Sequence, residues 1–181
     1  NFSEFKESLS EILVNKIDHH IKELWKIIPN LIYGYGNDKM DGVVGELLLK
    51  KGLTLATAES CTGGTVAKML TSKSGSSAYF HGSIVCYSNT SKKELLDVDE
   101  NEINNYGAVS KEVVEQMAIA VRKKFHTDFG LATSGIAGPT GGTEDKPVGT
   151  IWIAVSSANK VESKKLKLGY NRERNIHVSA L

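Results

Sequence analysis

The sequence has few cysteines, no long apolar stretch and almost no net charge, and each of these absences excludes a class of protein. Two cysteines in 181 residues are too few for a secreted disulfide scaffold, and neither belongs to a CxxC pair or a Cys/His cluster that would bind zinc. No apolar run approaches the roughly 18 residues that a membrane span needs, and no signal peptide opens the chain. We therefore expect a cytoplasmic protein with no metal, no cofactor and no membrane partner.

The charges nearly cancel, with 22 Lys and Arg against 21 Asp and Glu. The lysines occur in scattered pairs such as Lys50-Lys51 and Lys92-Lys93, a pattern typical of solvated faces. This balance does not favour a nucleic-acid partner. The length fits one ordinary domain, which can bury a core without disulfides or metal.

The spacing of apolar residues changes near residue 40. From Phe2 to Ile28 they recur at helical spacing, Pro29 closes the run, and loop-forming residues follow at 30–41. Beyond this point we expect helices at 43–51, 65–72, 91–96, 110–125 and from 172, and strands at 53–58, 79–87, 129–133, 149–156 and 161–168. Helices alternating with strands predict an α/β fold, here a three-layer α/β/α sandwich. Its sheet should be mixed and mostly parallel, because the last two strands form a hairpin.

Three segments place polar residues and glycines directly after a strand, where ligands bind in α/β sheets. In the first, residues 58–64, Gly63 and Gly64 let the backbone approach a ligand. The helix that follows should offer unpaired N–H groups to an anion or an oxyanion. Ser60 and Thr62 stand where a nucleophile would be, although both hydroxyls could simply cap the helix.

The second segment, residues 82–92, carries Tyr87, Asn89 and Lys92, whose side chains could converge on one site. Alternatively, Lys92 could lie on the solvated surface beside Lys93. The third, residues 133–150, is dense in glycine and too long for a plain connector. It matches neither a Walker A loop nor the GxGxxG and GxSxG motifs.

A serine nucleophile would need a base other than histidine here. Of the five histidines only His81 lies near these segments, so a Ser-His-Asp triad is poorly supported. Ser-Lys arrangements are known variants, and Tyr87 and Lys92 are the candidate bases. Cys61 competes as nucleophile, but a small cysteine beside a strand more often belongs to the core.

The order and spacing of these motifs resemble the CinA C-terminal family over roughly residues 43–181. The motifs that carry the resemblance are 58–64 (AESCTGG), Tyr87 and Asn89 with Lys92, 107–110 (GAVS), 134–139 (SGIAGP) with Gly141-Gly142, 146–149 (KPVG) and Arg172. Family members of this type are nicotinamide-nucleotide amidases, which hydrolyse nicotinamide mononucleotide to nicotinate mononucleotide and ammonia. The resemblance therefore implies a hydrolase that needs no cofactor and recycles pyridine nucleotides.

The resemblance makes Ser60 the nucleophile, with Tyr87 and Lys92 beside it as proton-transfer groups. Ser134 falls where the family places a site hydroxyl, and Arg172 where a basic residue assists substrate binding, with Arg174 as the alternative arginine. Together with the glycine-rich segments, this gives eight expected substrate-binding residues: Thr62, Gly63, Gly64, Asn89, Ser134, Gly135, Gly138 and Arg172.

The resemblance also implies a domain organisation. Residues 1–39 look like the C-terminal part of a linker domain, and residues 40–181 like a CinA-type amidase domain whose last helix is cut short. The chain starts without Met and stops within a helical pattern, so we expect a part of a longer protein. The expected partners are a small-molecule nucleotide and further copies of the chain, as a dimer or a higher oligomer. A non-catalytic nucleotide-binding or scaffold module of a competence-related protein is the alternative.

Overall fold

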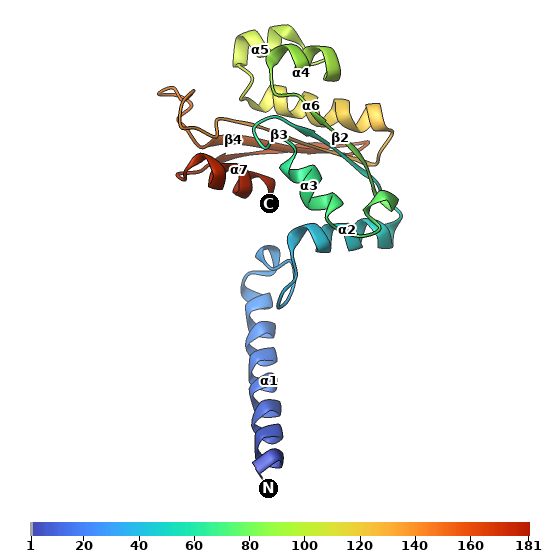
Figure 1. The fold of residues 1–181 in the computed structure, drawn as a ribbon, viewed down its shortest axis with the longest axis vertical. Coiled ribbons are helices and arrows are strands. Elements are labelled where there is room, and N and C mark those ends of the chain that lie inside the picture. Colours follow the sequence, from blue (N-terminus) through green and yellow to red (C-terminus); the bar gives the residue numbers. More distant parts are fainter. Residues whose placement is uncertain (1) are drawn as a thin grey trace. The chain divides into compact units, whose positions relative to one another are not determined.

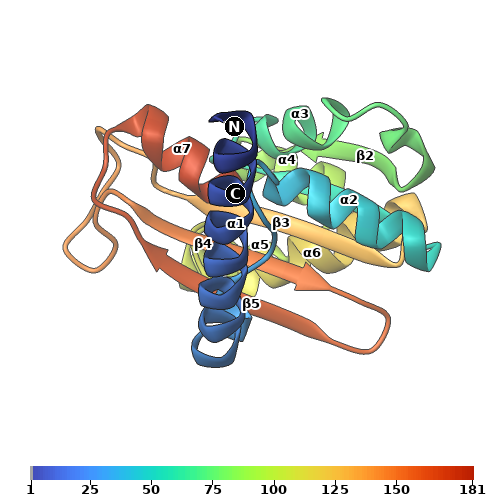
Figure 2. The same cartoon turned by 90° about the horizontal axis from the view of Figure 1, so that it is seen from below.

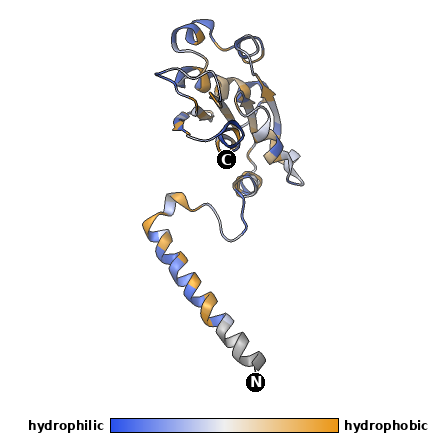
Figure 3. Cartoon of the chain, turned by 60° about the vertical axis from the view of Figure 1, so that its left-hand side comes forward, coloured by the Kyte–Doolittle hydropathy of each residue, from blue (hydrophilic) through white to orange (hydrophobic). Residues whose placement is uncertain are grey.

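The computed structural model describes the backbone of residues 2–181 and the side chains of residues 10–29 and 31–181, which fall into two compact units divided after Met40. The first unit consists mainly of the helix α1 (Phe2–Ile27), followed by a 3-10 turn at Pro29–Leu31. Apolar and polar residues alternate along the described part of α1 (Figure 3). The helix ends just before the proline, as predicted, because a proline disfavours helical geometry in the residue before it.

The second unit is built on a five-stranded mixed sheet with the order β2-β1-β3-β4-β5. The strands are β1 (Leu55–Glu59), β2 (Phe80–Val85), β3 (Phe129–Gly135), β4 (Thr150–Ser156) and β5 (Val161–Lys167). The strand β1 pairs in parallel with β2 and β3, whereas β4 pairs antiparallel with β3 and β5. Only β4 therefore runs against the other strands, and β2 and β5 form the two edges. The expected hairpin is the β4–β5 pair.

Helices cover both faces of this sheet, which gives the three layers expected from the sequence (Figures 1 and 2). On one face lies α6 (Lys111–Phe125), with α4 (Asn89–Leu96) and α5 (Glu100–Tyr106) packed on it. On the other face lie α2 (Met40–Lys51), α3 (Thr65–Thr71) and α7 (Arg172–Ala180). None of the helices in residues 2–181 is both long and apolar enough to span a membrane.

The helix α6 approaches the sheet closely because the strand residues beneath it are small. Ala56 and Ala58 of β1 are fully buried against it. A Cβ atom placed on Gly130 of β3 would lie only 2.1 Å from the carbonyl oxygen of Ala118 in α6. This close packing fixes the position of the loop before α6 relative to the carboxyl ends of β1 and β3.

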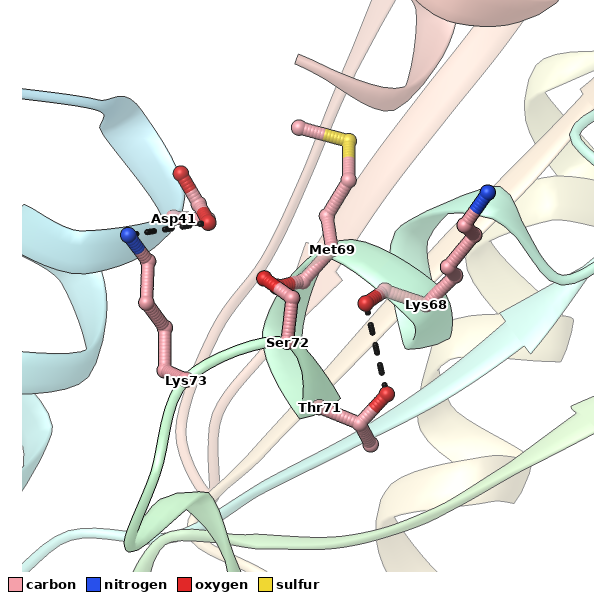
Figure 4. Close-up of polar contacts among 6 residues, drawn as sticks. All are labelled: Asp41, Lys68, Met69, Thr71, Ser72 and Lys73. Carbon is pink, nitrogen blue, oxygen red and sulfur yellow. Dashed lines mark hydrogen bonds and ion pairs between the residues drawn. The ribbon is translucent and has the colours of Figure 1, made fainter.

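On the opposite face, an ion pair joins two helices. Lys73 Nζ, just beyond α3, lies 3.6 Å from Asp41 Oδ2 near the start of α2 (Figure 4). The Thr71 hydroxyl in the same region donates to the carbonyl of Ala67 at 2.7 Å, and the carbonyl of Lys68 lies further away at 3.3 Å (Figure 4). These contacts secure the C-terminal end of α3, and its N-terminal end adjoins the candidate site.

Several element boundaries differ from the sequence prediction. The strand predicted from Leu53 begins at Leu55, because the Leu53 N–H donates to Leu48 at the end of α2 and so closes that helix. The strand predicted to reach Tyr87 ends at Val85. The helix α5 was not predicted: only Ile103 among its residues is buried, so the apolar spacing is too sparse to indicate it.

Candidate active site

The candidate site is a cavity of about 260 Å³ at the carboxyl ends of β1, β2 and β3. Its lining residues are Ser60, Cys61, Tyr87, Asn89, Lys92, Ala108, Val109, Ser134, Gly135, Ile136, Ala137, Gly138, Thr140, Gly141 and Arg172. Eight of the eleven residues predicted for the site belong to this lining. The structure thus brings together residues that lie up to 112 positions apart in the sequence, from Ser60 to Arg172.

A buried lysine and a serine form the centre of the cavity. Lys92 Nζ lies 3.0 Å from Ser60 Oγ and 2.9 Å from the carbonyl oxygen of Cys86, and only 1% of Lys92 is exposed. Both partners of the ammonium group are uncharged. Burial therefore lowers the pKa of Lys92 below its usual 10.5. A lysine that loses its proton more easily, in contact with a hydroxyl, is an arrangement that can deprotonate that hydroxyl.

The start of α4 explains why Lys92 points inward. Ser88 caps this helix: its hydroxyl accepts from the N–H of Ser91, and the Ser91 hydroxyl accepts from the N–H of Ser88. Lys92 and Leu96 then lie four residues apart on the same buried face of α4. Lys93, one position further, faces outward and pairs with Glu100. Lys92 is therefore not the surface residue that its neighbour suggested.

Ser60 lies in a tight turn immediately after β1. Its N–H donates to the carbonyl of Thr133 at 3.0 Å, and its carbonyl accepts from the N–H of Gly63 at 3.1 Å. Cys61, the competing nucleophile, also lines the cavity, but burial raises the pKa of its thiol to about 11. A thiol with such a pKa stays protonated at neutral pH, so the geometry favours Ser60 as nucleophile.

The N-terminus of α3 differs from what the sequence suggested. The buried carboxylate of Glu59 accepts hydrogen bonds from the N–H groups of Gly64 (2.9 Å), Val66 (3.1 Å) and Ala67 (2.8 Å). The prediction that this helix offers unpaired N–H groups to an anion is therefore wrong. Sequence reasoning missed Glu59, although an acidic residue just before a helix is a recognisable N-terminal signal.

Three predicted binding residues lie outside the cavity lining. Gly63 and Gly64 belong to the turn that Glu59 holds, and neither lines the cavity. The Thr62 hydroxyl is buried and lies 2.7 Å from the Thr133 hydroxyl, so it joins the turn after β1 to β3 instead of facing a ligand. Within the described part of the chain, the N–H groups of Cys61 and Thr62 donate to no other residue.

Tyr87 and Arg172 meet at the rim of the cavity. Arg172 donates to the Tyr87 hydroxyl at 2.8 Å and to the carbonyl of Gly138 at 2.7 Å, and Tyr87 is 59% exposed. Tyr87 is therefore tied to Arg172 and not to the Ser60–Lys92 pair. Arg174 instead stacks over the ring of Tyr170, 4.1 Å from its centroid, so Arg172 is the arginine at the cavity.

The glycine-rich loop forms part of the cavity wall and is held by α7. The buried amide of Asn175 donates to the carbonyls of Ala137 and Tyr170 at 3.0 Å and 2.9 Å. Gly138 has a φ of 89°, and a Cβ there would lie 2.5 Å from Val148, so this position requires glycine. Sequence reasoning missed Asn175, because nothing in its local pattern shows that it reaches a loop 38 residues earlier.

Ser134 and Asn89 complete the wall. The Ser134 hydroxyl lies 2.7 Å from the carbonyl oxygen of Ala108, and Gly135 follows it at the end of β3. Asn89 lines the cavity from the first position of α4. Among the residues that the structure describes, no group of three His, Cys, Asp or Glu side chains is placed to hold a metal ion.

Comparisons with known proteins relate this chain to one family. A family model described as the CinA C-terminal domain matches residues 37–181. A CinA-like protein from Cytophaga hutchinsonii is 49% identical over 171 residues, which cover 94% of this chain and 41% of the relative. A putative competence-damage inducible protein from Thermoanaerobacter pseudethanolicus is 47% identical over 148 residues, or 82% of this chain and 36% of the relative. The chain spans about two fifths of the length of these curated relatives.

Solved structures agree with this assignment. The competence damage-inducible protein A from Klebsiella pneumoniae superimposes with a TM-score of 0.74 at 31% identity, over 76% of this chain and 85% of that one. The competence/damage inducible protein CihA from Agrobacterium tumefaciens gives the same TM-score and identity over 81% and 93% of the two chains. With a family model that matches most of its length and relatives close to half identical, the chain belongs to the CinA family, of which it contains the C-terminal domain.

Proposed function

We propose that this domain is a serine amidohydrolase that converts nicotinamide mononucleotide to nicotinate mononucleotide and ammonia in the cytoplasm. The observation that carries the proposal is the 3.0 Å contact between Ser60 Oγ and Lys92 Nζ in the cavity. The buried lysine can act as a general base, because burial lowers its pKa. The choice of substrate rests on the resemblance of the motifs to nicotinamide-nucleotide amidases.

The proposed first step is acylation of Ser60. Lys92 takes the hydroxyl proton while Ser60 Oγ attacks the carboxamide carbon, and the C=O bond opens to an oxyanion. The N–H group of Cys61 follows the nucleophile directly, belongs to a residue that lines the cavity and has no acceptor in another described residue, so it is available to the oxyanion. When the tetrahedral intermediate collapses, the C–N bond breaks and Lys92 returns its proton to the departing nitrogen, which leaves as ammonia.

The second step is hydrolysis of the resulting ester. Lys92, again neutral, takes a proton from a water molecule that attacks the nicotinoyl carbon. Collapse of this second intermediate breaks the bond to Ser60 Oγ, and the lysine returns the proton to Ser60. The hydrogen bond from Lys92 to the carbonyl of Cys86 holds the amine in place through both steps. No additional proton-transfer residue is needed, because Lys92 contacts Ser60 directly.

The nucleotide part of the substrate is assigned to the rim of the cavity. Arg172 uses two of its five N–H donors on Gly138 and Tyr87, which leaves donors free for a phosphate. The glycine-rich loop beside it brings backbone close to the ligand, with Gly138 and Gly141 in left-handed conformations. Tyr87 therefore acts on the substrate side of the site in this proposal, and not as the proton-transfer group that the resemblance suggested.

Ammonia release tests the proposal directly. Purified protein is incubated with nicotinamide mononucleotide, the corresponding nucleoside and free nicotinamide, and ammonia is measured for each. We expect release from the mononucleotide above all, and its loss in Ser60→Ala. No ammonia at high protein concentration would reject the amidase. Saturable nucleotide binding without turnover, unchanged in Ser60→Ala, would instead indicate a non-catalytic binding module.

We also propose that residues 1–39 form the end of a linker domain and that the amidase domain occupies residues 40–181. The family model begins at residue 37, and the chain divides into two compact units after Met40. Each residue that lines the cavity belongs to the second unit.

A further inference from the structure

The hydroxyl of Ser134 has a fixed direction in this site. Its Oγ lies 2.7 Å from the carbonyl oxygen of Ala108, and Ser134 is only 1% exposed. A carbonyl oxygen carries no proton, so Ser134 must be the donor in this contact. Because a hydroxyl has a single proton, the oxygen of Ser134 can only accept a hydrogen bond from anything else that it meets.

Ser134 lines the same cavity as the proposed nucleophile, Ser60. Glu59 at the end of β1 pairs with Thr133 of β3 in a parallel register, and Ser60 and Ser134 are the residues that follow them in the sequence. The hydrogen bond from the N–H of Ser60 to the carbonyl of Thr133 keeps the two strand ends together. Both serines line the cavity. A group attacked by Ser60 therefore lies within the neighbourhood of the Ser134 oxygen.

The amide substrate can donate a hydrogen bond to a buried acceptor, whereas the ester intermediate and the carboxylate product cannot. A carboxamide carries two N–H donors, whereas an ester at the same position carries none, and neither does an ionised carboxylic acid. A buried acceptor that loses its donor costs free energy, and two facing acceptors repel each other. The same oxygen would therefore favour the amide substrate and disfavour the carboxylate product.

We propose that Ser134 selects the carboxamide by accepting a hydrogen bond from its –NH₂ group, and that the same lone pair promotes release of the carboxylate product. This inference rests on the proposed amidase function and adds a specificity-determining residue to it. Ala108 takes part through its backbone carbonyl, which occupies the only proton that Ser134 could otherwise donate to a carboxylate or to an ester oxygen.

Binding to a protein that cannot turn over tests the selection without relying on catalysis. In the Ser60→Ala background, dissociation constants are measured for nicotinamide mononucleotide and nicotinate mononucleotide. We expect a preference for the amide, which Ser134→Ala reduces by about tenfold or more. The change should come from weaker binding of the amide, with binding of the acid unchanged or tighter. An equal loss for both ligands would show a merely structural role and would overturn the proposal.

A matched pair of variants separates the hydroxyl from the shape of the side chain. Threonine and valine have nearly the same shape, but only threonine keeps the hydroxyl, so Ser134→Thr should retain the amide preference and Ser134→Val should lose it. Equal behaviour of the two variants, with thermal unfolding showing both folded, would contradict the assignment.

Turnover supplies an independent comparison in the otherwise unmodified protein. Ser134→Ala should lower kcat/KM about tenfold or more for the amide, but change it less than about threefold for the methyl ester of nicotinate mononucleotide, which has no N–H donor at that position. If the parent protein neither binds nor hydrolyses the amide, the proposed function itself fails, together with the inference. If it hydrolyses the amide and Ser134→Ala affects amide and ester alike, only the inference fails.

Discussion

At the scale of single residues, the site depends on a lysine that the fold withdraws from water. The flexible stem of Lys92 is buried, and its amine meets two neutral oxygen atoms and no carboxylate in its hydrogen bonds. A lysine on the surface would keep its proton at neutral pH, whereas burial favours the neutral amine that a general base requires. The proposed activation of Ser60 therefore depends on the packing that buries Lys92 in α4.

Replacing Lys92 tests its role as a base. Lys92→Arg should fail almost as badly as Lys92→Ala, because arginine keeps the positive charge but cannot release its proton near neutral pH. We expect kcat for ammonia release to fall by at least ~100-fold in both variants. Lys93→Ala is the matched control: this neighbour faces outward and pairs with Glu100, so kcat should change little. Near-normal kcat in Lys92→Arg would mean that the residue only attracts the substrate.

The pH dependence of activity should follow the same group. Because the neutral amine is the active form and burial lowers the pKa of Lys92, kcat/KM should rise with pH and level off below pH 10.5. A pH series of ammonia release measures this directly. A profile that falls as the pH rises through this range would contradict a lysine base.

The free energy of unfolding should also depend on the ionisation of Lys92, and it should increase with pH. Between the lowered pKa of folded Lys92 and the usual value of 10.5, the unfolded chain binds more protons than the folded one, so this group makes the free energy of unfolding increase with pH. Lys92→Met removes the contribution. The stability of the parent relative to this variant should therefore increase as the pH rises, and denaturant unfolding at several pH values measures the difference.

At the scale of elements, the junction of β1 and α3 is organised by a side chain from the strand. Glu59 satisfies three N–H groups at the start of the helix, a task that usually falls to a capping residue in the loop. The loop itself is thereby left free to form the turn that carries Ser60. Because this carboxylate already occupies the N-terminal end of α3, the proposed function assigns the phosphate of the nucleotide to Arg172 and the glycine-rich loop.

Glu59→Gln should weaken both this junction and the activity. One Glu59 oxygen accepts from Gly64 and Val66 and the other from Ala67, so a glutamine –NH₂ group would face an N–H donor at one of these places. We expect a loss of about 1–3 kcal/mol in the free energy of unfolding, together with a lower kcat. Glu94→Gln removes the same charge from an exposed position of α4 and should leave both quantities unchanged. A fully active and equally stable Glu59→Gln protein would show that the turn does not need this carboxylate.

At the scale of the whole molecule, the layers and the strand hairpin could be predicted from the sequence because they follow from local periodicity. Apolar and β-rich runs indicated the strands, and the helix predicted at 110–125 matches α6 to within one residue. The motifs and the resemblance together indicated eight of the residues that line the cavity. The contact between Tyr87 and Arg172 could not be predicted, because these residues lie 85 positions apart and no spacing rule connects such distant positions.

The second compact unit, residues 41–181, should be able to fold without the first. The cavity lining and both hydrophobic clusters of the sheet lie within residues 41–181. A protein starting at residue 37 should therefore fold alone and release ammonia with kcat/KM within about threefold of the full chain, because a domain with its own core is an independent unit. Circular dichroism and the ammonia assay check the two parts of this statement. A folded but inactive protein would show that residues 1–36 contribute to the site.

The position of β5 at the edge of the sheet has a consequence for the behaviour of the protein in concentrated solution. An unpaired edge exposes backbone N–H and carbonyl groups that can join the edge of another molecule and begin an aggregate. Here the edge strand carries Lys164, Lys165 and Lys167, so lysines project from both faces of the sheet. Two such edges repel each other, and the strand is therefore protected against growth into fibres while it stays accessible to solvent.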